Sequence, residues 1–194
     1  LFLAEKTSDD IAYYNGKQNV TAFYAIADQK FFSSLRAVYG VRYEDANIKV
    51  TNDKVDLEIA DINEKIFLPS ANLSYSLNDK MNLRASYFAS VNRPEFRELA
   101  PFAFYVFDKN AEIKGNSGLK IAHLNNYDLR YEWYPSANQV ISLGGFYKTI
   151  TNPVEFSIDI TQASTTFTYN NEKNAKIYGF EFEFRKNLDF IGTA

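Results

Sequence analysis

Apolar and polar residues alternate with a period of two along much of the chain, and this pattern constrains the fold more than any other feature. It is clearest in residues 35–44, 71–77, 83–90, 127–134 and 178–185. Successive side chains of a β-strand point to opposite faces, so each segment predicts a strand with one apolar and one polar face. No segment of similar length has the 3.6-residue period of a helix. The pattern therefore predicts an all-β fold.

Three further segments complete the expected strands. Residues 19–31 and 140–150 have the composition of strands, although apolar residues occur on both of their faces. An eighth strand is expected within residues 154–169, where Phe156 and Ile158 alternate with polar residues. The chain thus predicts an antiparallel meander of about eight strands.

The connections between these strands alternate in length. Short turns rich in Ser, Asn, Asp and Pro are expected at residues 32–34, 78–80, 135–138 and 187–189. Long polar stretches occupy residues 51–64, 92–122 and 151–174. A soluble sandwich has no reason to place every long loop on one side, whereas outer-membrane barrels have short periplasmic turns and long external loops. The alternation therefore favours a transmembrane β-barrel over a soluble β-sandwich.

The aromatic residues support this interpretation. They make up 16% of the chain, with 17 Phe and 14 Tyr. Tyrosines near strand ends suit the two aromatic girdles of a membrane barrel, where the ring is apolar and the hydroxyl stays wet. The residues in such positions are Tyr43, Tyr75, Tyr87, Tyr131 and Tyr134. A simpler explanation stays open, because tyrosine is also a good strand former.

Composition argues against several other functions. The net charge of −3 gives no overall basic footprint for nucleic acid. Without cysteine, and with His123 as the single histidine, the chain offers no thiolate nucleophile, disulfide framework or multi-His metal cluster. No stretch approaches the ~20 apolar residues that a spanning helix requires. We therefore expect no catalytic residues, no metal site and no cofactor.

The size of the expected barrel follows from its loops and charges. Eight strands would close the smallest membrane barrel, which is narrow and filled by side chains. The long stretch 92–122 and the many charges on the polar face suit a wider barrel with a plug, in which these strands are an arc of roughly 22. Neither end of the sequence has the features of a natural terminus, so we expect the 194 residues to be a fragment.

Residues 92–102 (NRPEFRELAPF) carry a more specific signal. Together with residues 115–120, 126–135, 146–153 and 178–186, in this order, they resemble the barrel of TonB-dependent outer-membrane receptors, in particular those typical of Bacteroidetes-type bacteria. The resemblance extends from about residue 19 to the C-terminus. It corresponds to the middle-to-late part of the barrel.

The resemblance implies a function and a set of partners. Such a receptor takes up a large nutrient (an iron chelate, cobalamin or a glycan) in an energy-dependent way and does no chemistry on it. The implied partners are outer-membrane lipid, the receptor's own plug domain and the TonB energy complex, with a surface lipoprotein as a further one. The plug, the N-terminal coupling segment and the terminal strands are absent from these 194 residues. A complete eight-stranded outer-membrane anchor or adhesin, and a soluble carbohydrate-binding β-sandwich, remain alternatives.

The charges of the polar face are the first candidate site. A bare Arg or Lys facing lipid costs about 2–4 kcal/mol at the bilayer midplane, so in a membrane barrel these residues must face the lumen. There they would hold a plug domain or form a polar transit surface; in a soluble sheet they would simply be solvated. The set is Arg36, Arg42, Glu44, Arg84, Asp128, Arg130, Glu132, Glu181, Glu183 and Arg185.

A second candidate site lies in the stretch 92–107. Its charges offer contacts to a carboxylate or phosphate of a ligand, or pair with one another to fix the loop over the barrel mouth. Its aromatic run offers stacking surface to a ligand, or continues a strand above the membrane. The candidate ligand-mouth residues are Arg93, Glu95, Arg97, Glu98, Phe102, Phe104 and Tyr105.

Overall fold

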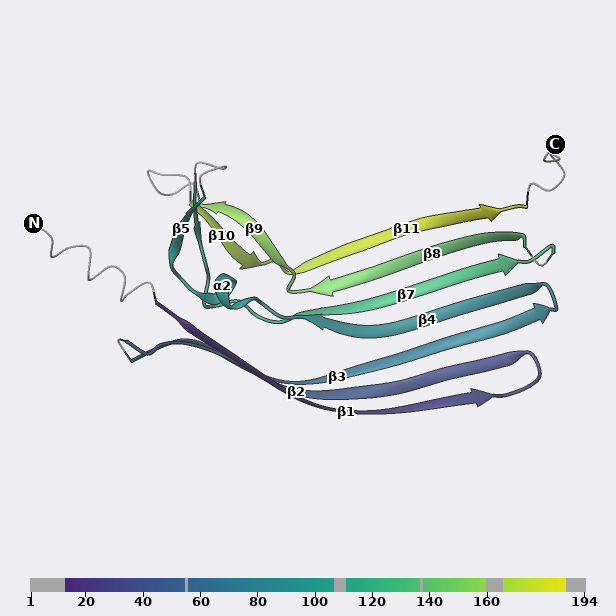
Figure 1. The fold of residues 1–194 in the computed structure, drawn as a ribbon, viewed down its shortest axis with the longest axis horizontal. Coiled ribbons are helices and arrows are strands. Elements are labelled where there is room, and N and C mark those ends of the chain that lie inside the picture. Colours follow the sequence, from purple (N-terminus) through teal and green to yellow (C-terminus); the bar gives the residue numbers. More distant parts are fainter. Residues whose placement is uncertain (1–12, 55, 107–110, 137, 160–165, 188–194) are drawn as a thin grey trace, which may run out of the picture.

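The protein is described by a computed structural model over residues 13–54, 56–106, 111–136, 138–159 and 166–187. Its main feature is a seven-stranded antiparallel sheet, called the large sheet, in which the strands follow one another in chain order (Figure 1). The strands are β1 (Asn15–Lys30), β2 (Leu35–Asn52), β3 (Leu57–Asn78), β4 (Met81–Asn92), β7 (Ala122–Trp133), β8 (Val140–Thr151) and β11 (Asn174–Arg185). The predicted all-β meander is confirmed.

A second, four-stranded sheet, called the small sheet, stands at one end of the large one (Figure 1). Its order is β5 (Ala103–Val106), β6 (Ala111–Lys114), β10 (Thr166–Asn171) and β9 (Val154–Asp159). The β6–β10 pair is parallel and joins two long connections that are distant in sequence. A four-residue helix, α2 (Phe96–Leu99), lies beside it. No helix among the described residues is long and apolar enough to cross a membrane.

The expected eighth barrel strand is wrong, because residues 154–169 contribute β9 and β10 to the small sheet instead. The reason is a bend after β8. Asn152 adopts a left-handed φ of 54°. The Asn152 N–H donates to the Lys173 carbonyl at 3.2 Å, and the Glu172 N–H donates to the Pro153 carbonyl at 2.9 Å. These bonds join the ends of β8 and β11 to the starts of the β9–β10 pair. The alternating residues Phe156 and Ile158 do lie in a strand, but that strand belongs to the small sheet and not to the large one.

The unequal connections lie at opposite ends of the large sheet, as predicted. The turns after β1, β3 and β7 lie at one end, and the longer connections lie at the other (Figure 1). The expected turn at residues 187–189 falls almost wholly outside the described residues. The expected loop at 51–64 is wrong in extent, because β2 and β3 continue as a hairpin to Asn52 and Leu57. In this hairpin Ile48, Val50 and Ala60 are the buried residues of the alternating pattern, because they pack against Leu99 and Leu119.

The two faces of the large sheet differ in chemistry. Directly paired residues share a face, so the ladder places one row of mostly tyrosine side chains across six strands. The row is Tyr39, Ala71, Tyr87, Tyr127, Tyr147 and Tyr178. Large apolar side chains on this face are uncovered, and Phe180 is 86% exposed. This apolar face carries no charged residue at positions 35–43, 127–133 or 178–184.

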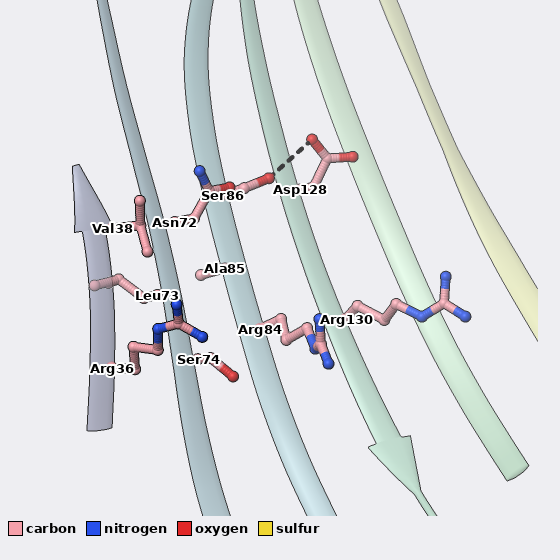
Figure 2. A pocket seen from close by; sticks show the side chains of 10 residues that line it. All are labelled: Arg36, Val38, Asn72, Leu73, Ser74, Arg84, Ala85, Ser86, Asp128 and Arg130. Atoms are coloured by element: carbon pink, nitrogen blue, oxygen red, sulfur yellow. Dashed lines mark hydrogen bonds between the residues drawn. The ribbon is translucent and has the colours of Figure 1, made fainter. Parts of the chain in front are cut away.

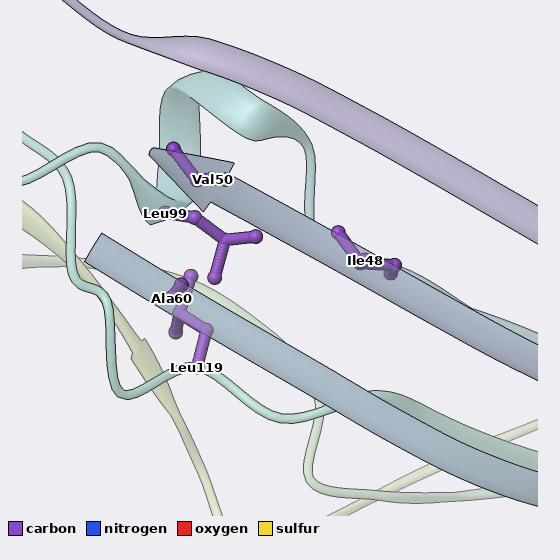
Figure 3. Close-up of a cluster of buried hydrophobic side chains, with 5 residues drawn as sticks. All are labelled: Ile48, Val50, Ala60, Leu99 and Leu119. Atoms are coloured by element: carbon purple, nitrogen blue, oxygen red, sulfur yellow. The ribbon is translucent and has the colours of Figure 1, made fainter. Parts of the chain in front are cut away.

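A conventional core exists only where the connections fold back onto the large sheet. Figure 3 shows Leu99, the last residue of α2, and Leu119 packed against Ile48, Val50 and Ala60 of the β2–β3 hairpin. All five are at most 6% exposed. The segments around Leu99 and Leu119 are therefore docked onto β2 and β3, and this docking positions the candidate mouth residues.

Candidate functional site

All ten charged residues of the first candidate site lie on one face of the large sheet. The ladder puts Arg36, Ser74, Arg84 and Arg130 in one row, and Glu132 and Glu183 flank it in the next row through Ser142. This charged face is opposite the tyrosine row. That it lines a lumen or contacts a plug remains a prediction.

Three arginines of this face border a hollow of about 540 Å³, shown in Figure 2. They are Arg36, Arg84 and Arg130, which come from β2, β4 and β7. Asp128 lies at the far side of the hollow and accepts a hydrogen bond from the Ser86 hydroxyl at 3.3 Å. The hollow therefore presents cationic groups on one side and a carboxylate on the other.

Each arginine is oriented by a carboxylate on the same face. Arg36 Nη2 lies 2.5 Å from Asp28 of β1, which the sequence analysis had not singled out. Arg84 Nε lies 3.1 Å from Glu132, and Arg130 Nη2 lies 2.6 Å from Glu183. Like charges in neighbouring strands repel, so the interleaved carboxylates allow arginines to stand side by side. Arg84, Glu132, Arg130 and Glu183 form one connected charge ladder from β4 to β11, and the Arg36–Asp28 pair stands apart from it beyond Ser74 of β3.

Glu132 is the most enclosed member of this ladder. Its side chain is 9% exposed, and it accepts a hydrogen bond from the Tyr134 hydroxyl at 3.0 Å. Tyr134 lies in the turn after β7, where burial and the Glu132 carboxylate both raise the pKa of its phenol above the ordinary value. The tyrosine thus stays neutral and donates to the carboxylate.

Arg93 pairs with a residue of the large sheet rather than with its own loop. Its guanidinium pairs with Glu44 of β2, whose side chain is 7% exposed. Arg42 Nε donates to the other oxygen of Glu44 at 2.6 Å. Glu44 therefore joins the two candidate sites. The β3–β4 ladder ends at Ser70 and Phe88, so this contact ties the loop to β2 beyond the point where the sheet has divided.

The remaining charges of the stretch organise α2. Glu95 caps the helix, its side chain accepting from the Glu98 backbone while Glu98 accepts from the Glu95 backbone N–H at 2.9 Å. This reciprocal capping satisfies two backbone donors. Arg97 lies over the Phe104 ring at 4.5 Å from its centroid. Glu95 and Glu98 are thus engaged with the loop itself, and Arg97 is the cation that reaches the small sheet.

The aromatic run continues a strand, and part of it is exposed. Phe102 stacks on Tyr14 with ring centroids 6.2 Å apart, while Phe104 and Tyr105 belong to β5. Tyr105 is 49% exposed.

The small sheet has one apolar face, and most of its members were not expected at the mouth. Its ladder places Phe104, Ile113, Phe167 and Ile158 in one row, and Phe156 and Tyr169 in the next. The Phe156 and Phe167 rings are parallel within 7° at 4.9 Å. Tyr169 packs on the buried core, whereas Phe156 and Ile158 are 40% and 56% exposed. The sequence showed that Phe156 and Ile158 alternate with polar residues, but no local sequence pattern indicates which sheet this strand joins.

His123 has an ordinary polar partner. Its Nε2 lies 2.7 Å from Glu64 of β3 and so adds a second tie across the divided part of the sheet. Among the described residues no group of three or more His, Asp or Glu side chains is placed to hold a metal ion.

Comparison with known proteins identifies the architecture. The model of the outer membrane protein beta-barrel family matches residues 3–189. No curated protein matches the chain. Receptors are among the solved structures that match it, and the chain spans about a quarter to a third of the length of those described below.

Three of these structures illustrate the likeness. The hemophore receptor HasR of Serratia marcescens, solved as a double mutant with its hemophore HasA and heme, has a TM-score of 0.72 at 12% identity, covering 87% of this chain and 32% of that chain. The siderophore receptor PirA of Pseudomonas aeruginosa has a TM-score of 0.68 at 16% identity, covering 86% and 31%. A mutant of the ferric enterobactin receptor PfeA of Pseudomonas aeruginosa, in complex with enterobactin, has a TM-score of 0.64 at 18% identity, covering 85% and 24%.

The expected membrane fold and location are therefore confirmed. The large sheet is a single layer with an uncovered apolar face, and β1 and β11 do not pair with each other among the described residues, so it is neither a sandwich nor a closed small barrel. Such a sheet suits an arc of a wider barrel, apolar outside and charged inside. The chain belongs to the outer membrane protein β-barrel family and is a wall segment of a bacterial outer-membrane barrel.

Proposed function

We propose that this chain is part of a TonB-dependent receptor that takes up a large nutrient, and that it supplies barrel wall together with part of the ligand mouth. The apolar face of the small sheet is the observation that carries this proposal. It places Phe156 and Ile158 partly in the open, with Arg97 held over Phe104 at the same sheet. A surface of rings with one cation suits a large ligand that has both flat apolar and anionic parts.

The likeness to solved receptors supports the same class of function. Their titles name a siderophore, ferric enterobactin, and heme with a hemophore. An iron chelate is therefore the first nutrient to test, and cobalamin and glycans are the next. No enzymatic step is proposed, because uptake requires binding and release but no bond to be made in the ligand.

The charged face is proposed to hold the plug of this receptor. Arg36, Arg84 and Arg130 are already oriented by carboxylates, so a polar domain in the lumen meets a preorganised surface and orders few side chains on docking. The TonB energy complex would act through the plug, and a surface lipoprotein would contact the external loops. Both are partners of the whole receptor.

Uptake by whole cells tests the proposal. Cells that display the full-length protein are offered labelled ferric enterobactin, heme, cobalamin and a maltooligosaccharide, with and without a protonophore. We expect one of these probes to accumulate, and to stop accumulating when the protonophore collapses the energy supply. Failure to accumulate any of the four in cells shown to display the protein would overturn the proposal.

Variants of the small sheet then locate the ligand. Phe156→Ala together with Arg97→Ala removes one exposed ring and the cation while leaving the large sheet untouched. We expect weaker binding by about tenfold or more, as for loss of two anchors of a binding surface. Lys65→Ala is the matched control, because Lys65 lies on β3 outside the small sheet.

A further inference from the structure

Two asparagines outside the candidate sites lie where the two long connections meet. Asn116 belongs to the connection between β6 and β7, and Asn171 is the last residue of β10. The hydrogen bonds that their side chains make to the other connection span 51 to 54 residues of sequence. They therefore join two segments that no local sequence pattern brings together.

The Asn116 side chain is engaged through both its nitrogen and its oxygen. Its Nδ2 donates to the Tyr169 carbonyl at 2.9 Å and to Asn170 Oδ1 at 3.1 Å. Its Oδ1 accepts from the Gly118 N–H at 2.9 Å, which fixes the turn of its own loop. The Asn116 backbone N–H donates to the Glu98 carbonyl of α2 at 2.6 Å. One residue thus contacts β10, the loop before β7 and α2.

Asn171 makes a second tie of the same kind. Its Oδ1 accepts from the Lys120 N–H at 2.8 Å, and its Nδ2 donates to the Lys120 carbonyl at 3.2 Å. The Nδ2 also donates to the Asn152 carbonyl at 2.8 Å, where the chain has left β8. A carboxamide can do this because it offers both donors and an acceptor in one plane. The end of β10 is therefore tied both to the loop before β7 and to the bend after β8.

These ties matter because, among the described residues, no strand of the small sheet pairs with a strand of the large sheet. The small sheet rests on the core through Tyr169 and Val154, and apolar packing of this kind is not directional. Hydrogen bonds require a narrow range of distance and angle, so the two carboxamides fix orientation as well as position. The backbone also approaches closely here, since a Cβ added to Gly115 would lie 2.1 Å from the Ala100 carbonyl oxygen. The small sheet is thus held against the end of α2.

We propose that Asn116 and Asn171 are positioning residues for the ligand surface of the small sheet. The Asn116 backbone binds the carbonyl of Glu98, the residue after Arg97. Its side chain binds β10, which pairs with β9 and so carries the strand of Phe156. Asn116 thereby sets the distance between the cation and the exposed ring, and a surface held in this way loses less freedom when a ligand binds. The inference rests on the proposed function for its ligand, but the attachment of the small sheet does not.

Hydrogen exchange of the full-length protein without ligand tests the attachment. Asn116→Asp and Asn171→Asp each keep the size of the side chain and its acceptor oxygen but lose the Nδ2 donor. We expect the amides of β9 and β10 to exchange about tenfold faster in each variant, while those of β7 and β8 stay protected. Asn19→Asp is the matched control, because it makes the same change on β1 of the large sheet. Exchange of β9 and β10 at the wild-type rate in both variants would overturn the inference.

Ligand affinity tests whether the asparagines act through the ligand surface. The probes are ferric enterobactin, heme, cobalamin and a maltooligosaccharide, and Asn116→Asp should weaken binding of the one that the wild type binds about tenfold. In a background that already carries Phe156→Ala and Arg97→Ala, the same change should cost less than about twofold, because little is left to position. An equal loss in both backgrounds would show a general loss of folded protein and would overturn the positioning role. A wild type that binds none of the four probes would overturn the proposed function and the positioning role together, whereas the exchange measurement decides the attachment by itself.

Discussion

The large sheet and the region docked at its end bury their apolar residues in opposite ways. On the large sheet Phe180 is 86% exposed, while the Glu132 side chain on the other face is 9% exposed. In the docked region Leu99 and Ile48 are fully buried. The chain therefore combines a sheet whose apolar face is exposed, as suits contact with lipid, and a small core whose apolar residues are buried, as suits contact with water.

The two regions also differ in how they are joined. Every ladder of the large sheet connects strands that are neighbours in its chain order, and all of these ladders are antiparallel. The small sheet joins two distant connections through the parallel β6–β10 pair. The first region therefore depends on local alternation, and the second on a few buried contacts. Substitutions in one region should therefore change its stability without changing that of the other.

The largest effect is expected for Arg93→Ala. This change leaves Glu44 in a nearly closed site with only one of its two arginine partners, and losing one member of a buried pair costs about 3–5 kcal/mol. Residues 96–99 should then exchange their amide hydrogens much faster, while β7 and β8 stay protected. Lys49→Ala is the control, because the Lys49–Glu58 pair is exposed. Equal exchange in both variants would show that Glu44 does not anchor the loop.

A charge on the apolar face comes next. Leu129→Arg places a guanidinium among hydrocarbon and should destabilise the folded barrel by about 2–4 kcal/mol. Refolding into lipid vesicles, followed by the mobility shift of unheated samples on SDS gels, measures the loss. Asp128→Asn changes the charge at the neighbouring residue on the opposite face and should have little effect. No loss for Leu129→Arg together with a gain in stability for Asp128→Asn would mean that the faces are assigned the wrong way round.

A third prediction concerns the register of β8 and β11. A Cβ at Gly179 would lie 2.7 Å from the Phe146 ring, so Gly179→Val should cost about 1–3 kcal/mol through overpacking. Gly144→Val is matched to it, because a Cβ there meets nothing closer than 3.8 Å. Urea titration of vesicle-embedded protein gives both values. Similar midpoints for the two variants would show that the Phe146 ring moves aside freely.

The smallest effect is expected for Arg97→Ala. The contact of Arg97 with Phe104 is worth about 0.5–1 kcal/mol at a partly exposed site. Hydrogen exchange of β5 should rise slightly, and β4 should not change. An effect as large as that of Arg93→Ala would mean that Arg97 holds the loop in place and does not simply face the mouth.

Sequence patterns anticipated the large sheet better than the small one. Alternation located the strands around Leu35, Leu83, Tyr127 and Tyr178, and the lengths of the connections placed the long loops together. The placement of Phe156 was wrong because alternation reports a strand but not its partner. Asp28 was missed as the partner of Arg36, since no local pattern distinguishes it from other polar residues of β1.

The sequence by itself determined that the chain forms an antiparallel meander, which residues share a face, and that one face is free of charge at positions 35–43, 127–133 and 178–184. These properties follow from the two-residue period of a strand and need no knowledge of distant contacts. Only the tertiary structure decided that β9 and β10 leave the barrel for a second sheet and that Arg93 pairs with Glu44. Both depend on segments that meet across about fifty residues of chain, and pairing over such separations is set by packing in three dimensions rather than by local pattern.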